Sequence, residues 1–141
     1  MTTAAPARTE VVFDDGPARV RLGLLALATD LTLEVDAAAV LAADEALYVT
    51  RVAFENPVTA ASLKAMAPAL AAAAARLVPG ERLDALAFGC TAASAAIGDD
   101  AVRAAVTAER PGIPCVTPTS ALLAAARALG VAKLAVLAPY S

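Results

Sequence analysis

Short aliphatic runs alternate along this chain with longer alanine-rich stretches. The runs predict five β-strands, and the stretches between them have the length and spacing of helices. The predicted strands are Arg21–Leu27, Ala46–Val52, Leu83–Phe88, Pro114–Thr117 and Lys133–Ala138. The predicted helices are Leu31–Ala43, Thr59–Leu77, Asp99–Arg110 and Thr119–Leu129.

This alternation indicates an α/β fold. Thr59 and Asp99 have the residue types of helix N-caps, and Gly80 and Gly130 mark the ends of the second and last helices. Nearly continuous apolar strands between helices predict a parallel sheet covered on both faces. Right-handed crossovers then give a doubly wound, flavodoxin-like sheet of order 2-1-3-4-5. We expect residues 19–141 to form this α/β lobe and residues 1–18 to be an N-terminal arm.

Composition narrows the chemistry. The chain has 141 residues, 60% of them hydrophobic, which suits one helix-rich domain. The net charge of −3 and the lack of a basic cluster argue against nucleic-acid binding. There is no histidine and there are only two cysteines, so no metal site is expected, and phosphate-binding glycine motifs are absent, so no cofactor is expected. Without a membrane-length apolar segment or a secretory signal, the sequence predicts a cytoplasmic protein.

Polar groups follow every predicted strand. Since ligands of such sheets bind at the carboxyl ends of the strands, these segments predict a site. They are Ala28–Asp30, Phe54–Pro57, Gly89–Thr91, Pro118–Ser120 and Pro139–Ser141.

Cys90 is the candidate reactive group, because it opens the turn that leaves the third strand. A helix beginning there would direct backbone N–H groups at the thiol or at a bound carboxylate, a setting that can lower a thiol pKa. The alternative interpretation is that Cys90 is a small buried apolar residue. The other cysteine, Cys115, lies near the start of the fourth strand, where a packing role is favoured.

Four further positions are candidate substrate-binding residues. Thr29 and Asp30 could orient a substrate or hold the thiol, and one of them could cap the first helix. Asn56 could donate its amide to a carboxylate or simply begin a turn before Pro57. Tyr140 could donate its hydroxyl to a substrate oxygen or be exposed.

Arg51, inside the second strand, could pair with an acid on a neighbouring element or lie at the surface.

Several segments together resemble one family. RLGLLALATDLTLEVD, YVTRVAFENPVTAASLKAM, ALAFGCTAASAAIG, RPGIPCVTPTSALLAAARALG and KLAVLAPY, in that order, are similar to the N-terminal half of the maleate isomerase and arylmalonate decarboxylase group of the Asp/Glu racemase superfamily. The nearest likeness is to the ectoine-utilization proteins called EutA. The resemblance covers the chain from Arg21 to Ser141.

The resemblance implies a cofactor-independent enzyme with two pseudo-symmetric lobes and a substrate cleft between them. Cys90 matches the first of two catalytic cysteines, Thr91 matches a position that binds a substrate carboxylate, and Tyr140 matches a substrate-contacting tyrosine. Maleate isomerases carry asparagine where this chain has Asp30, and arylmalonate decarboxylases carry glycine where it has Cys90. The second lobe and its cysteine would lie beyond Ser141, so we expect the 141-residue chain alone to be inactive.

The leading hypothesis is an isomerase or racemase acting on a small carboxylic acid through the Cys90 thiolate, in a chain that forms homo-oligomers. Its activity could serve ectoine catabolism. The alternative is a non-catalytic α/β domain that binds a small molecule. A phospho-receiver domain shares the fold but needs an aspartate at the end of the third strand, where this chain has Gly89 and Cys90.

Overall fold

A parallel β-sheet forms the centre of the protein. The structure is a computed structural model that describes residues 18–138. Its strands are β1 (Val20–Leu27), β2 (Glu45–Val52), β3 (Ala85–Phe88) and β4 (Cys115–Val116), in the order β2-β1-β3-β4. All three pairings are parallel. The predicted α/β class and the order of the first four strands are therefore confirmed.

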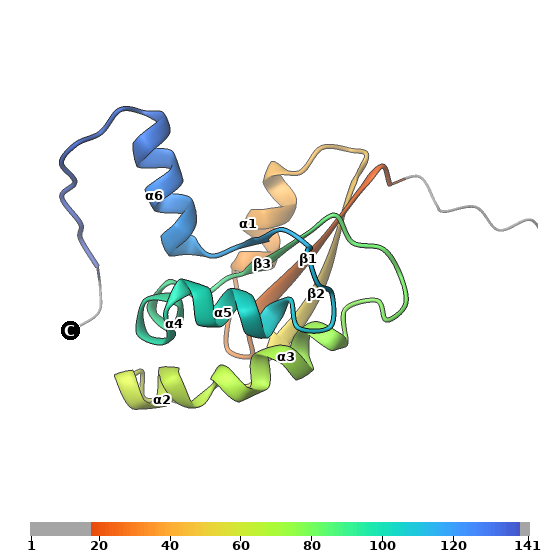
Figure 1. The fold of residues 1–141 in the computed structure, drawn as a ribbon, viewed down its shortest axis with the longest axis horizontal. Helices are drawn as coiled ribbons and strands as arrows, with labels where there is room; N and C mark the ends of the chain where they lie inside the picture. Colours follow the sequence, from red (N-terminus) through yellow and green to blue (C-terminus); the bar gives the residue numbers. More distant parts are fainter. Residues whose placement is uncertain (1–17, 139–141) are drawn as a thin grey trace, which may run out of the picture.

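Helices cover the two faces of this sheet unequally (Figure 1). Four of them pack on one face, and α1 lies on the other. The four are α2 (Ala60–Ala65), α3 (Ala67–Ala75), α4 (Thr91–Ile97) and α5 (Asp99–Val106), and α1 spans Leu33–Val40. The last helix, α6 (Pro118–Ala128), projects away from the sheet, contacts α4, and contains no buried residue.

Helix boundaries follow from the local sequence. Thr59 caps α2 in a capping box with Ser62, as its residue type predicts. The predicted helix Thr59–Leu77 is instead two helices, because Pro68 has no N–H to donate to the carbonyl of Lys64. Gly130 ends α6 with a positive φ of 65°. The N–H groups of Gly130 and of the following residue there donate to carbonyls of the last helical turn, as in a Schellman motif.

The hydrophobic core lies between the sheet and α2–α5. Leu25, Val52 and Phe88 supply its floor from three strands, and Leu70 and Val102 close it from the helices; each is at most 1% exposed. A Cβ at Gly23, on the same face, would come within 2.6 Å of Leu86. The absence of a side chain at Gly23 therefore lets buried leucines pack directly against β1.

The opposite face of the sheet is only partly covered. Between α1 and β4 an apolar groove of about 260 Å³ remains open. Its lining is aliphatic and includes Leu22, Leu24, Leu47, Ala87, Val116 and Val40. Several large side chains at its margins are exposed, among them Val40 at 82% and Val116 at 46%.

The predicted fifth strand is not formed, so the five-stranded order is not confirmed. Residues 131–138 have no strand structure and are exposed, with Leu137 fully accessible and Val136 at 74%. The edge strand beside which they would lie, β4, is only two residues long. So short an edge strand offers few backbone groups with which a fifth strand could form hydrogen bonds. The apolar pattern of the sequence does not show how short β4 is.

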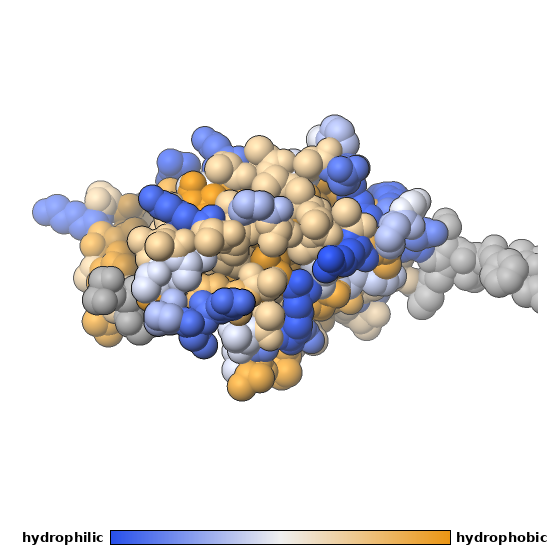
Figure 2. Space-filling model, turned by 90° about the horizontal axis from the view of Figure 1, so that it is seen from below, coloured by the Kyte–Doolittle hydropathy of each residue, from blue (hydrophilic) through white to orange (hydrophobic). Residues whose placement is uncertain are grey.

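The outer surface of the helical layer reflects the alanine-rich composition. Viewed from the side of α2 and α3, its centre is broadly hydrophobic and its charged groups lie mostly around that region (Figure 2). Within residues 18–138, no helix has the length and apolar character needed to cross a membrane. The predicted N-terminal arm lies outside the described residues, except for Ala18.

Candidate active site

Two turns meet at the carboxyl edge of the sheet. One joins β1 to α1 through Ala28–Asp30, and the other joins β3 to α4 through Gly89 and Cys90. Because β1 and β3 are neighbours, the N–H of Gly89 bonds to the carbonyl oxygen of Leu25 at 2.9 Å. The strand order thus brings the thiol turn beside the Asp30 turn, as expected for the carboxyl ends of adjacent parallel strands.

Cys90 is the N-cap residue of α4. Its backbone is extended, with φ −125° and ψ 109°, and its Sγ accepts a hydrogen bond from the N–H of Ala93 at 3.4 Å. The residue is 8% exposed and belongs to the core cluster beside Ala93. A helix does begin at this turn, and the thiol satisfies one of its backbone donors.

The thiol has a raised pKa. Burial is the largest cause, and the negative charge of Asp30 adds to it, while hydrogen bonds from the N–H groups of Ala93 and Ala92 act in the opposite direction. A helix start was expected to favour a lowered pKa, but here desolvation outweighs the two N–H groups. In this structure Cys90 therefore carries its proton at neutral pH.

Asp30 organises the start of α1. Its Oδ1 accepts hydrogen bonds from the N–H groups of Thr32 at 2.9 Å and Leu33 at 2.8 Å. These bonds, with a smaller contribution from Arg51, hold the pKa of its carboxyl below the ordinary value. The N-cap position of α1 is Thr32, so neither Thr29 nor Asp30 is the N-cap residue; Asp30 instead bonds to the N–H groups at the helix start from two residues before it, and stays charged.

The other predicted residues are placed differently. Thr91, the first residue of α4, is exposed beside the thiol, and Thr29 is exposed in the turn before Asp30. Asn56 is exposed on the loop that follows β2. Tyr140 lies outside the described residues. The structure thus brings Asp30, Cys90 and Thr91 to one edge, and the substrate-binding roles stay predictions.

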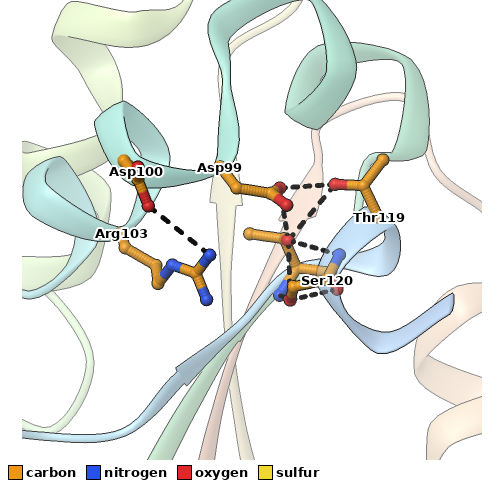
Figure 3. Close-up of polar contacts among 6 residues, drawn as sticks. Asp99, Asp100, Arg103, Thr119 and Ser120 are labelled. Carbon is orange, nitrogen blue, oxygen red and sulfur yellow. Dashed lines mark hydrogen bonds and ion pairs between the residues drawn. The ribbon is translucent and has the colours of Figure 1, made fainter. Parts of the chain in front are cut away.

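A second polar cluster joins the starts of α5 and α6 (Figure 3). The carboxylate of Asp99 accepts hydrogen bonds from the hydroxyls of Thr119 and of Thr117, the latter at 2.6 Å. Thr117 is 1% exposed and also forms a capping box with Ser120 at the start of α6. These bonds lower the pKa of the Asp99 carboxyl. Its neighbour Asp100 pairs instead with Arg103 at 3.6 Å.

The prediction that Asp99 is an N-cap was wrong. Gly98 occupies the N-cap position of α5, and Asp99 is the first helical residue, with its side chain directed at α6. The residue type suited a cap, but the hydroxyls of a distant segment are its partners. The Thr-Pro-Thr-Ser sequence, with a proline after a capping threonine, is the local signal for the start of α6.

Ser94 was also not anticipated. It lies one turn after Cys90 on α4, is 1% exposed, and its Oγ has no hydrogen-bond partner among the described residues. Ser94 lies among alanines at a position that the helical pattern assigns to the buried side, so the sequence pattern gave no reason to single it out. No group of three or more metal-ligating side chains occurs within residues 18–138.

The fold defines a class: an α/β fold with a parallel sheet, similar to that of a maleate isomerase. The maleate isomerase Iso from Pseudomonas putida S16 superposes with a TM-score of 0.61 at 24% identity, over 79% of this chain and 50% of that one. A cysteine-to-alanine variant of Iso, solved with maleate, gives a TM-score of 0.56 at 22% identity, over 79% and 49%. This chain therefore spans about half the length of each enzyme.

No protein-family model matches the sequence. No curated protein matches it either. At these identities the structural likeness shows the fold alone.

Proposed function

We propose that this chain is one lobe of an isomerase or racemase-type enzyme that acts on a small carboxylic acid, with Cys90 as its reactive thiol. The observation that carries the proposal is the position of Cys90, at the carboxyl end of β3 and at the start of α4. The fold shared with maleate isomerase over 79% of the chain supports it. The EutA-like motifs favour a role in ectoine breakdown without a cofactor, and we propose that the protein acts in the cytoplasm.

Two reactions fit a thiol at this place. In the first, the Cys90 thiolate removes the proton from the α-carbon of the acid, so the C–H bond breaks, an S–H bond forms, and the electron pair moves into the carboxylate. In the second, the thiolate adds to an activated C=C bond, so a C–S bond forms, the π bond breaks, and its electron pair moves into the carboxylate that activates it. Rotation about the resulting single bond and expulsion of the thiolate then give the other geometric isomer.

The substrate-binding groups follow from the same edge. The exposed hydroxyl of Thr91 would hold the substrate carboxylate beside the thiol, with Thr29 and Asp30 on the adjacent turn and Asn56 and Tyr140 completing the set. The chain spans about half of the maleate isomerases it resembles, so we propose that a second lobe supplies the opposite wall. Because the Cys90 pKa is raised, binding of substrate and second lobe must favour the thiolate.

Burial of the thiol supports a second candidate, a non-catalytic domain that binds a small molecule. Cys90 is 8% exposed and its pKa is raised, which are the properties of a packing cysteine. Under this alternative the thiol stabilises the start of α4 and any ligand binds beside it. The two candidates differ in whether the thiol reacts and whether a ligand protects it.

Site-resolved alkylation separates these candidates. Iodoacetamide labelling of Cys90 and Cys115 would be followed by mass spectrometry across pH, with and without maleate, malonate or glutamate. We expect Cys90 labelling to rise on the alkaline side of neutrality and to be slowed several-fold by one of these acids, while Cys115 labelling is unaffected. A Cys90 that resists labelling in folded protein at every pH would contradict a reactive thiol. Labelling that none of the acids slows would contradict a carboxylate site.

We also propose that the chain self-associates. The open groove and the exposed side chains of Leu134, Val136 and Leu137 support this, because contiguous exposed apolar surface is typical of association sites. Light scattering coupled to size-exclusion chromatography should show a mass above 14.0 kDa that decreases on dilution. A monomer over the whole concentration range would contradict it.

A further inference from the structure

Arg51 makes an unusual set of contacts for a strand residue. It lies one position before the end of β2, paired with Ala26 of β1, and its side chain lies on the face that carries α1. One guanidinium nitrogen, Nη1, donates to the carbonyl oxygens of Leu27 at 3.0 Å and Asp30 at 2.7 Å. The other, Nη2, bonds to the carboxylate of Glu34 on α1 at 2.6 Å.

These bonds hold the turn between β1 and α1 at both of its ends. Leu27 is the last residue of β1, Asp30 ends the turn, and Glu34 belongs to the first turn of α1. The planar guanidinium presents its donors in a fixed arrangement, so one side chain can hold all three groups together. The ion pair with Glu34 is about 41% exposed on both sides and contributes little energy by itself. The positioning therefore comes mainly from the two carbonyl bonds.

The turn held by Arg51 packs against the thiol turn. The Asp30 carboxylate accepts a hydrogen bond from the N–H of Leu33. The side chain of Leu33 lies so close to Gly89 that a Cβ on Gly89 would be 2.0 Å from the Leu33 Cδ2. Gly89 immediately precedes Cys90. A continuous chain of contacts thus runs from Arg51 through Asp30 and Leu33 to Gly89, the residue before Cys90.

We propose that Arg51 is a positioning residue for the Cys90 site, which fixes the Asp30 carboxylate beside the thiol by clamping the β1–α1 turn. The significance of this clamp for catalysis rests on the proposed function, whereas the clamp itself does not. Among the candidate site residues that the structure describes, Arg51 bonds to Asp30, through its backbone carbonyl oxygen, so it acts on the thiol through Asp30. The sequence alone left a surface role open for it.

The electrostatic surroundings of the thiol make the clamp measurable. The helix that Cys90 caps, α4, carries no charged residue. Around it, Lys64 lies on α2, Arg127 on α6, Glu34 and Asp36 on α1, and Asp99, Asp100 and Arg103 on α5. The charge that raises the pKa of Cys90 is that of Asp30. If the turn is released, the carboxylate moves away and the pKa of the thiol falls.

The test is the pH profile of iodoacetamide labelling at Cys90, with Cys115 in the same sample as the internal reference. In Arg51→Ala the midpoint should move to lower pH, so that labelling below the midpoint becomes faster, by up to about threefold. Arg51→Lys keeps the positive charge but not the planar arrangement of donors. Its labelling midpoint should therefore move in the same direction by a smaller amount. Glu34→Gln keeps both carbonyl bonds and should stay close to the wild-type profile.

Two controls make the result specific. Arg19→Ala removes an arginine that pairs with Asp44 at 2.9 Å, 81% exposed at the amino end of β1, and should leave Cys90 unchanged. In an Asp30→Asn background, Arg51→Ala should cause no further shift of the midpoint, because the charge that Arg51 positions is already gone.

Three outcomes would overturn the proposal: an unchanged Cys90 profile in folded Arg51→Ala, an equal shift at Cys90 and Cys115, or a full shift that persists in the Asp30→Asn background. Should Arg51→Ala not fold, Arg51→Lys carries the same test. A shift with Cys90 unprotected by any carboxylic acid would contradict the proposed function and leave the clamp standing. Protection of Cys90 by one of the acids, with no shift of its labelling midpoint in Arg51→Ala, would contradict the clamp and leave the proposed function standing.

Discussion

The two faces of the sheet are made from the same strands and differ in how they are covered. On one face, leucines and alanines of α2–α5 close over Leu25 and Phe88, and those two residues are at most 1% exposed. On the other face, α1 covers β1 and β2 in part, and an open groove of about 260 Å³ remains toward β4. Within β1, Leu25 thus belongs to the packed core, whereas Leu24 and Ala26 are buried outside that core and Leu24 lines the groove.

This difference separates stability from function. The covered face supplies most of the buried apolar area and therefore most of the hydrophobic stabilisation. The other face carries α1, Arg51 and the Asp30 turn, which contribute few buried side chains and instead set the surroundings of Cys90. Substitutions on the first face should thus change the free energy of unfolding, and those on the second the chemistry of the thiol.

The largest expected effect comes from a matched pair of leucine truncations. Leu25→Ala removes a fully buried side chain from the covered face and should lower the free energy of unfolding by about 3 kcal/mol. Leu47→Ala, in the lining of the groove, removes a half-exposed side chain and should cost about 1 kcal/mol. Urea denaturation followed by circular dichroism measures both. Equal losses would mean that the second face is covered in solution, for example by association.

A second pair compares glycines that face the two layers. In Gly23→Ala the new Cβ meets Leu86, Leu77 and Leu83 at 2.6 to 3.0 Å. Since these three leucines belong to the hydrophobic core, we expect the free energy of unfolding to fall by about 2 kcal/mol. In Gly89→Ala the Cβ meets the tip of Leu33, a half-exposed side chain that can turn outward.

Gly89→Ala should therefore cost about 1 kcal/mol but change the labelling of Cys90. Thermal unfolding and site-resolved alkylation of both variants test this division. If Gly23→Ala altered the thiol more than Gly89→Ala did, the two faces would not divide stability and function in this way.

The smallest expected effect concerns the contact between α5 and α6. Thr117→Val removes a buried hydroxyl bonded to Asp99 and should cost about 1 kcal/mol near neutral pH. Because the Asp99 pKa is lowered in the fold, its contribution is present above the unfolded value of about 3.9 and is lost as pH falls through the lower, folded value. The difference between wild type and Thr117→Val should thus shrink in acid. An equal difference at pH 7 and in strong acid would exclude the ionised carboxylate as the partner.

The candidate site could be predicted only in part. Apolar strands and their following turns located Cys90, Thr91 and Asp30 at one edge, because the geometry of parallel sheets places strand ends together. The direction of the thiol pKa could not be predicted, since it depends on burial by α2–α5 and on the distance to Asp30. Arg51 could not be assigned a partner, because its partners lie across β1 and on α1.

Sequence by itself determined the four strands, most helix positions, the cap at Thr59 and the end of α6 at Gly130. These features depend on periodicity and on backbone preferences of single residues, which act over a few neighbouring positions. Tertiary structure alone decided that residues 133–138 stay outside the sheet, that Asp99 bonds to α6 rather than capping α5, and that burial raises the pKa of the Cys90 thiol. Each of these depends on which distant groups meet in space, and therefore on packing that no local pattern records.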